Sequence, residues 1–124
     1  MTQGNIVSEQ ELQQTISDFM LELGIPAHLR GYQYLRSAVS MCVQDMELAC
    51  SVTKLLYPDL AKMYQTTDQK IERAIRNAIE VSWGRGNDEL FEEMFGFCSE
   101  YTRPTNSEYI AVVADYIRIK YHLL

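Results

Sequence analysis

The chain has 124 residues, of which 47% are apolar, and it carries a net charge of −6. This length is typical of one compact domain, so we expect a single domain over residues 1–124. No apolar run approaches the ~20 residues that cross a bilayer. The first ten residues, MTQGNIVSEQ, contain no basic segment followed by an apolar one. We therefore expect a cytoplasmic protein whose residues 1–7 form a flexible leader.

The cysteines and histidines indicate neither disulfides nor a metal site. The three cysteines are an odd number, which argues against a closed set of disulfides. Cys42 and Cys50 are expected on one helix, where a rise of ~1.5 Å per residue separates them by ~12 Å, beyond the ~7 Å that a disulfide allows. Neither His28 nor His122 matches a metal-ligand spacing with these thiols or with Cys98. We expect buried thiols, no metal and no cofactor.

Charge is distributed unevenly along the chain. Residues 53–86 hold six basic and four acidic residues, a balance of +2. Residues 1–52 hold two basic and six acidic residues, and residues 87–124 hold three and seven, so each of these segments is −4. Proteins that bind nucleic acid are usually basic overall. The basic centre nevertheless indicates an anionic partner for residues 53–86.

The first helices are predicted from caps and periodicity. Ser8 and Glu11 form a capping box before apolar residues at helical spacing, and Gly24 ends that helix. Residues 25–31 are expected as a turn. From about Tyr32, apolar residues recur every three or four positions as far as Cys50, which predicts one long amphipathic helix.

The centre of the chain predicts two helices with a short turn between them. Pro58 lacks an N–H and therefore begins a helix or kinks one. Residues 65–67 are polar, and Thr67 is a suitable N-cap for a helix over residues 68–83. Gly84 and Gly86 follow that helix and are expected to end it. One stripe of it is apolar or small and is expected to be buried: Ile71, Ala74, Ile75, Ala78, Ile79 and Ser82.

The last part of the chain predicts a short helix at about 89–97 and a longer one after Pro104. Thr105 and Glu108 form a second capping box, and apolar residues at helical spacing continue nearly to Leu124. No stretch alternates apolar and polar residues with the period of a strand. The predicted fold class is therefore all-α, with about six helices.

The central pair has the proportions of a helix-turn-helix over residues 57–83. In such a motif the second helix enters the major groove of DNA with side chains near its N-terminus. Arg and Lys can donate to guanine, Asn and Gln can pair with adenine, and Glu can accept from cytosine. The same residue types occur on ordinary solvated helices, so the pattern alone leaves both interpretations open. The expected DNA-binding residues are Gln69, Lys70, Glu72, Arg73, Arg76 and Asn77 on the outward face, with Lys54 and Lys62 as candidate phosphate contacts.

No feature of the sequence indicates catalysis. No histidine lies in a recognisable arrangement with a serine or cysteine, and no glycine loop of the phosphate-binding type occurs. The acidic clusters, such as Glu92-Glu93, are most simply solvated helix faces. We expect no enzyme, no small-molecule substrate and no membrane partner.

Four stretches of the sequence carry a family resemblance: GIPAHLRGYQYLRSAVSM (24–41), TKLLYPDLAKMYQTT (53–67), IERAIRNAIEVSWGRGN (71–87) and PTNSEYIAVVAD (104–115). In these, and over nearly its whole length, the chain resembles the C-terminal effector domain of the master response regulator of endospore formation (stage zero sporulation protein A). The resemblance implies a six-helix domain that binds double-stranded DNA through its helix-turn-helix. It also implies sequence-specific control of transcription in sporulation.

The resemblance further implies roles for individual residues. Base reading falls on Lys70, Glu72 and Arg73, and contacts to the DNA backbone fall near Arg76 and Asn77. The family has arginine where this chain has Lys70, and lysine cannot make the planar two-pronged contact of arginine. The family usually has histidine where this chain has Asn77. The last helix, residues 105–124, is implied to pair two copies of the domain as a homodimer.

A second hypothesis treats the chain as a protein-interaction module. In this interpretation it pairs with a full-length regulator through its last helix and modulates that regulator without reading DNA. The net charge of −6, Lys70 in place of arginine and the apolar ending Leu123-Leu124 motivate it. If the acidic residues at 88–93 lie beside the outward face of helix 68–83, duplex DNA is disfavoured, so their position discriminates between the hypotheses.

Overall fold

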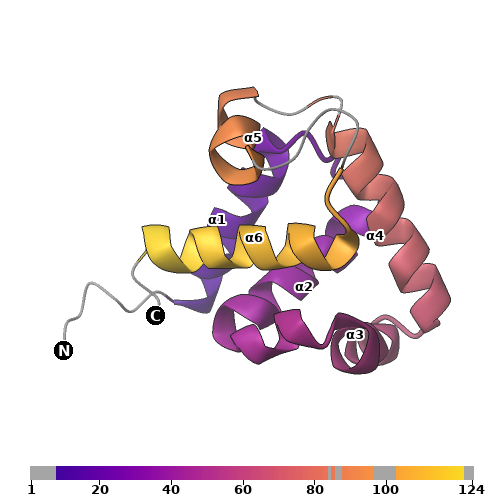
Figure 1. Ribbon diagram of the computed structural model, residues 1–124. Coiled ribbons are helices and arrows are strands. Elements are labelled where there is room, and N and C mark those ends of the chain that lie inside the picture. The colour runs from indigo at the N-terminus through magenta and orange to yellow at the C-terminus, as the bar shows by residue number, and fades with distance from the viewer. Residues whose placement is uncertain (1–7, 84, 86–87, 97–102, 122–124) are drawn as a thin grey trace.

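The computed structural model describes residues 8–83, 85, 88–96 and 103–121. This part of the chain forms six α-helices and no strand, which confirms the all-α fold class (Figure 1). The α-helices are α1 (Glu9–Glu22), α2 (Arg30–Gln44), α3 (Tyr57–Met63), α4 (Asp68–Trp83), α5 (Asp88–Phe95) and α6 (Asn106–Lys120). A 3₁₀ helix (Met46–Cys50) and a π-helix (Val52–Leu56) connect α2 to α3. The expected leader 1–7, Gly84, Gly86, Cys98 and residues 122–124 lie outside the described residues.

Both predicted capping boxes form. Ser8 Oγ accepts a hydrogen bond from the Glu11 N–H at 3.1 Å, and Glu11 Oε1 accepts one from the Ser8 N–H at 2.9 Å. Thr105 and Glu108 make the same reciprocal pair at the start of α6, at 3.1 and 2.8 Å. Gly24, with a φ of 80°, ends the first helical segment as expected. Local sequence therefore determines where α1 and α6 begin.

The predicted long helix from Tyr32 to Cys50 is wrong, because it breaks at Asp45. The backbone of Asp45 is extended, with a φ of −151°, and its side chain accepts from the Glu47 N–H at 3.1 Å. This side chain caps the 3₁₀ helix and so replaces helical hydrogen bonding at that point. Cys42 is buried near the end of α2 and Cys50 is exposed at the end of the 3₁₀ helix, so the prediction that they share one helix is also wrong. The expectation of buried thiols is confirmed for Cys42 and wrong for Cys50, because the 3₁₀ helix turns Cys50 into solvent.

Gly31 is a second correction, because it lies inside α2 and not in the turn expected over residues 25–31. A Cβ at Gly31 would lie 2.2 Å from the carbonyl oxygen of Ala74 and 2.8 Å from the Cβ of Ala78. The first turn of α2 therefore approaches the backbone of α4 more closely than any other residue type would permit. Helix α2 begins at Arg30, before the first residue of its apolar pattern. Gly31 is needed there for the close packing of α2 on α4 and does not mark a turn.

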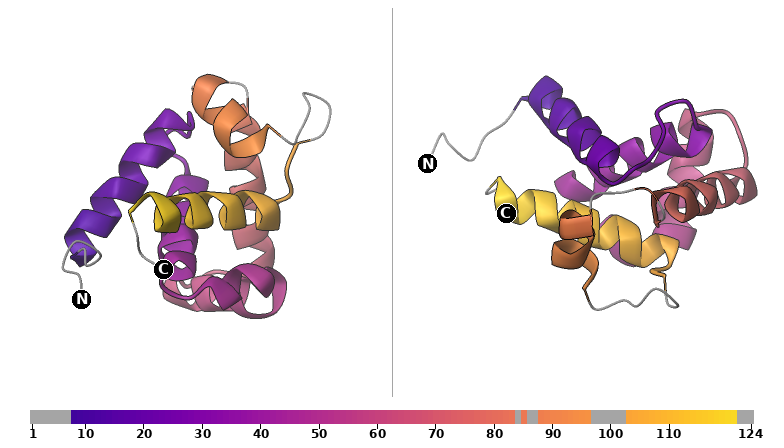
Figure 2. Two further views of the ribbon diagram at one scale, coloured as in Figure 1. Left: turned by 60° about the vertical axis from the view of Figure 1, so that its left-hand side comes forward. Right: turned by 90° about the horizontal axis from the view of Figure 1, so that it is seen from above.

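The core is built around α2, which packs against α1, α4 and α6. In both Figure 1 and Figure 2, α6 crosses α2. The guanidinium of Arg118 on α6 donates to the carbonyl oxygen of Val43 at 2.6 Å, where the last carbonyls of α2 lack helical partners. This contact places a cation at the negative end of α2, which has no basic residue in its own last turn.

A buried hydroxyl network connects α4 to two other helices. Ser82 Oγ donates to the carbonyl oxygen of Leu23 at 2.6 Å and lies 2.8 Å from the hydroxyl of Tyr109. Because the one proton of Ser82 goes to Leu23, the Tyr109 hydroxyl donates to Ser82 Oγ. Ser82 was expected in the stripe only for its small size, and it holds the C-terminal end of α4 against α1 and α6.

Among the described residues, no helix is both long and apolar enough to cross a membrane.

Candidate nucleic-acid interface

The helix-turn-helix consists of α3, residues 64–67 and α4, which agrees with the boundaries predicted from the sequence. In the turn, Gln65 has a φ of 54°, and the Thr66 N–H donates to the carbonyl oxygen of Ala61 at 2.9 Å. This left-handed residue ends α3 in the way that glycine commonly does. Thr67 Oγ1 accepts from the Lys70 N–H at 3.2 Å and so caps α4 as predicted.

The buried stripe of α4 is confirmed, and it fixes which side of the helix faces outward. Ala74 is half-buried, and the other five predicted positions are buried. The face that remains in solvent carries the six predicted DNA-binding residues of this helix, of which Glu72 is half-buried and the other five are exposed. At about 100° per residue, Gln69, Arg73 and Arg76 lie along the middle of that face, Lys70 and Asn77 lie to one side, and Glu72 lies to the other.

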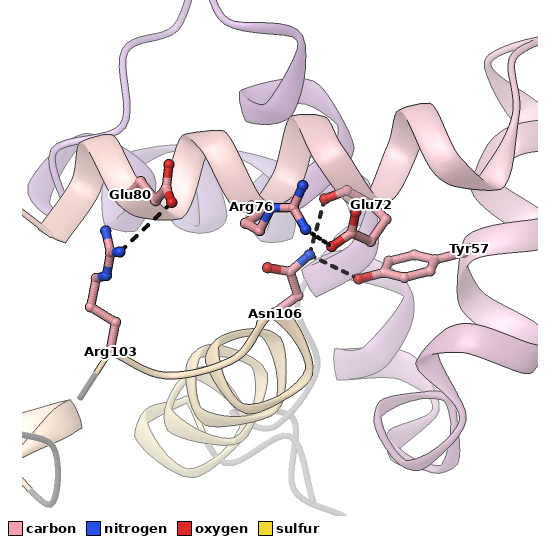
Figure 3. Close-up of polar contacts among 6 residues, drawn as sticks. All are labelled: Tyr57, Glu72, Arg76, Glu80, Arg103 and Asn106. Carbon is pink, nitrogen blue, oxygen red and sulfur yellow. Dashed lines mark hydrogen bonds and ion pairs between the residues drawn. The ribbon is translucent and has the colours of Figure 1, made fainter.

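On one side, which we call the Glu72 side, a groove runs between α4, the residues before α3 and the start of α6. Its lining includes Thr53, Tyr57, Glu72, Arg76, Glu80, Arg103 and Asn106. The cations of this groove are paired with carboxylates, as Figure 3 shows. Arg76 donates to Glu72 Oε2 at 2.9 Å, and Arg103 lies 3.7 Å from Glu80 Oε2. Two arginines and two glutamates therefore leave this side without net charge.

Asn106, the first residue of α6, connects three elements on the Glu72 side. Its Nδ2 donates to the hydroxyl of Tyr57 at 2.9 Å and to the main-chain carbonyl of Glu72 at 3.1 Å (Figure 3). Burial raises the pKa of Tyr57, while the hydrogen bond from Asn106 acts in the opposite direction. Asn106 thus holds the first turns of α4 against the start of α3 and the N-terminus of α6.

The other side of α4, which we call the Lys70 side, is a groove between α4, the turn before it and the N-terminus of α2. Its lining is Arg30, Tyr34, Tyr64, Gln65, Thr66, Lys70, Arg73, Ala74 and Asn77. Three of these residues are cations and none is acidic. The aromatic rings of Tyr34 and Tyr64 lie 4.9 Å apart, and the Tyr64 hydroxyl shares a 2.6 Å hydrogen bond with Ser37 Oγ. The two tyrosine rings therefore form a fixed aromatic wall of this groove. The formal charge of the groove lining is +3.

One comparison with known proteins bears on this geometry. The family model described as "Sporulation initiation factor Spo0A C terminal" matches residues 16–117, which is most of the chain. The chain belongs to this Spo0A C-terminal family. It is a family of DNA-binding effector domains and not an enzyme family, which agrees with the resemblance drawn from the sequence.

The acidic helix α5 lies away from the N-terminal half of α4, where the predicted DNA-binding residues are. Figures 1 and 2 show α5 near the C-terminal end of α4 and α3 near its N-terminal end. The rings of Trp83 and Phe91 lie 5.1 Å apart there, and Glu93 accepts a 2.5 Å hydrogen bond from the Tyr116 hydroxyl. Trp83 is ten residues beyond Arg73, or ~15 Å along the helix. Acidic residues of α5 line neither groove beside α4.

Lys54 and Lys62 do not lie on α4. Lys54 is exposed in the π-helix, and Lys62 is exposed in the last turn of α3. Neither lines the grooves on the two sides of α4. Their assignment as phosphate contacts of this Spo0A-family domain stays a prediction.

Two residues that line the grooves beside α4 were not predicted from the sequence. Asn106 follows the N-cap of α6, and its position in the capping box gives no indication that its amide reaches α4. Arg30 was included in an expected turn, and only the packing of Gly31 against Ala74 brings it to the Lys70 side. The sequence signal available for Arg30 was its charge next to a glycine, which is too common to be specific.

Proposed function

We propose that this chain is a sequence-specific, DNA-binding transcriptional regulator that inserts the N-terminal half of α4 into the major groove. The observation that carries the proposal is the outward face of α4. Gln69, Lys70, Arg73 and Asn77 are exposed together on a helix whose opposite face is buried. Their donors and acceptors suit base edges. Neither Lys70 nor Arg73 forms a salt bridge among the described residues, and Asp68 and Glu72 line a pocket together with Gln69 and Arg73. Lys54 and Lys62 are proposed as additional phosphate contacts.

Within this proposal, Lys70 and Arg73 are the residues most available to bases. Both are exposed and line the acid-free groove, and Arg73 lies near the middle of the outward face. Glu72 and Arg76 differ, because their side chains already form an ion pair at 2.9 Å. A contact from Glu72 to cytosine, or from Arg76 to the DNA backbone, has to compete with that pair.

The decisive experiment selects binding sequences from a pool of randomised duplexes and then measures electrophoretic shifts at stated salt concentrations. Arg73→Ala is compared with Arg85→Ala, an exposed arginine beyond the C-terminal end of α4. A good base contact contributes about 1–3 kcal/mol of discrimination, which corresponds to roughly 5- to 150-fold. We expect Arg73→Ala to lose that preference at one or two base pairs and Arg85→Ala to retain it.

Two outcomes contradict the proposal. The first is a parent chain that selects no sequence from the pool at any salt concentration. The second is an Arg73→Ala variant with the same selected sequence and affinity as the parent. Circular dichroism of each variant checks that its helices are intact, so that a loss of binding is not mistaken for unfolding.

A second candidate is association through α6, either with another copy of the chain or with a related regulator. Ile119 is 57% exposed and Tyr121 is 36% exposed at the end of this helix. Large exposed apolar side chains often mark protein contacts. Sedimentation equilibrium of the parent and of Ile119→Glu tests homodimer formation. We expect a dimer of the parent that the glutamate weakens, whereas a monomeric parent at all concentrations, with and without DNA, contradicts pairing of two copies.

A further inference from the structure

Arg30 is a cation that lies beside α4 although it belongs to α2, which is not part of the helix-turn-helix. It is the first residue of α2 and is exposed, and it lines the same groove as Lys70 and Arg73 of α4. The salt bridges of the described residues include none to Arg30, Lys70 or Arg73. This groove therefore combines three cations from two helices that are far apart in the sequence, and none of the three is in an ion pair among the described residues. Arg73 also lines a second pocket, which includes Asp68 and Glu72.

The close approach of α2 to α4 builds this combination. Gly31 leaves no space for a side chain against the Ala74 carbonyl, so the backbone of α2 lies directly on the second turn of α4. Arg30 immediately precedes Gly31 and is thereby held beside the residues that follow Arg73. A contact between two main chains is more rigid than a contact between long side chains. The backbone of Arg30 is therefore held in a fixed position next to α4.

The electrostatics of the groove favour an anion. Its lining contains no carboxylate, in contrast with the Glu72 side, where each arginine has an acidic partner. The first turn of α2 has no acidic residue, and Leu29 at its N-cap provides no side-chain hydrogen bond. The positive end of the helix dipole therefore adds to the charge of Arg30. Guanidinium groups match the geometry of phosphate oxygens.

We propose that Arg30 binds a phosphate of the DNA backbone at the edge of the major groove and thereby sets the register of α4 on the duplex. This inference rests on the proposed function, because it takes α4 to lie in that groove. Arg30 emerges from a helix beside α4 and not from its outward face, so the sugar-phosphate strand bordering the groove is within its reach before base edges are. Contacts to phosphates fix position and orientation without reading sequence.

The test compares Arg30→Gln with Arg36→Gln by electrophoretic shift over a series of salt concentrations, using the duplex selected by the parent chain. Arg36 lies on the same helix and faces α1, with its guanidinium 5.8 Å from the ring centre of Tyr32. Both substitutions remove one positive charge. Each phosphate contact contributes a slope of about 0.9 in the logarithmic salt dependence, or roughly eightfold in affinity at 0.1 M salt relative to 1 M.

We expect Arg30→Gln to reduce the slope by about 0.9 and the selected sequence to stay unchanged, because a phosphate contact carries no base preference. Arg36→Gln should retain the parental slope, and Arg30→Lys should retain most of it because the charge remains. Neutral methylphosphonates placed one at a time along the duplex should identify a position that weakens the parent and leaves Arg30→Gln unaffected.

Equal slopes for Arg30→Gln and Arg36→Gln overturn the inference while leaving sequence-specific binding intact. A methylphosphonate scan that weakens parent and Arg30→Gln equally at every position also overturns it. A parent chain that binds no selected duplex overturns this inference together with the proposed function. Circular dichroism and urea unfolding of both glutamine variants separate these outcomes from a change in folding.

Discussion

The Lys70 side and the Glu72 side of α4 each carry arginine or lysine side chains, but those cations have different neighbours. On the Glu72 side, Arg76 pairs with Glu72, and Arg103 lies beside Glu80. The groove on the Lys70 side has three cations and no carboxylate. Counting basic residues along a helix therefore does not locate an anion-binding surface, because ion pairs within the protein can neutralise one side and leave the other positive.

The two sides also differ in how they hold α4. On the Glu72 side, the amide of Asn106 donates to the main chain of α4 and to Tyr57. On the Lys70 side, the support is steric, through Gly31 against Ala74. Hydrogen bonds hold one side and close packing the other, so each can be removed separately by substitution.

The largest effect on stability is expected from Gly31→Ala. Its new Cβ would lie 2.2 Å from the Ala74 carbonyl oxygen, so α2 and α4 must separate. Overpacking of this kind costs about 1–3 kcal/mol, although alanine has the higher helix propensity by about 1 kcal/mol. Urea unfolding measures the loss, and DNA affinity should fall as well because Arg30 moves. Gln33→Ala, at an exposed position of α2, is the control, and equal stabilities of the two variants would contradict the close approach.

A smaller effect is expected from Asn106→Ala on the Glu72 side. This variant removes the donor to Tyr57 and to the Glu72 carbonyl, a loss of about 1–2 kcal/mol in the free energy of unfolding. The next residue, Ser107, is exposed, and Ser107→Ala serves as the matched control. DNA affinity measured well below the unfolding temperature should change little, since the amide of Asn106 is directed to Tyr57 and the Glu72 carbonyl and lies off the outward face of α4. No stability difference between the two variants would show that the bridging contacts contribute nothing.

Glu72→Gln should change stability even less but should alter binding. Its ion pair with Arg76 is an exposed i,i+4 pair, which contributes about 0.3–0.5 kcal/mol. Freeing Arg76 makes the Glu72 side positive, so the salt slope for duplexes of random sequence should increase by about 0.9. Glu92→Gln on α5 changes the net charge equally and should leave the slope unchanged. A slope unaffected by Glu72→Gln would mean that Arg76 contacts phosphate without leaving its partner, or does not contact DNA.

The smallest effect concerns alkaline pH. Burial raises the pKa of Tyr57 above its usual value of 10.0, so the folded chain holds this proton more strongly than the unfolded chain. The corresponding stability is complete below pH ~10 and is lost as the pH rises from there through the folded pKa. Tyr57→Phe should therefore lessen the fall in stability above pH ~10. The free energy of unfolding of parent and variant is measured with urea at several pH values. An equal fall of this free energy above pH ~10 in both proteins would contradict a raised pKa of Tyr57.

Much of the fold follows from short-range sequence signals. Ser8 with Glu11 and Thr105 with Glu108 mark the beginnings of α1 and α6, because both partners of each capping box lie within one helical turn. The 3.6-residue periodicity of α4 predicts its buried stripe and hence its outward face. The break at Asp45 was missed because apolar periodicity continues through it, while the side chain of Asp45 changes the backbone hydrogen bonding. Gly31 was misplaced because glycine is also common in turns.

The helical fold, the helix-turn-helix boundaries and the set of side chains that point away from the core follow from periodicity and from contacts between near neighbours in the chain. Which of those side chains are already paired depends on the packing of distant segments. Arg30 reaches the groove of Arg73, and Asn106 reaches Tyr57 and the main chain of Glu72, across 43, 49 and 34 positions of sequence. No local pattern encodes such contacts, since they depend on how α2, α4 and α6 pack against one another.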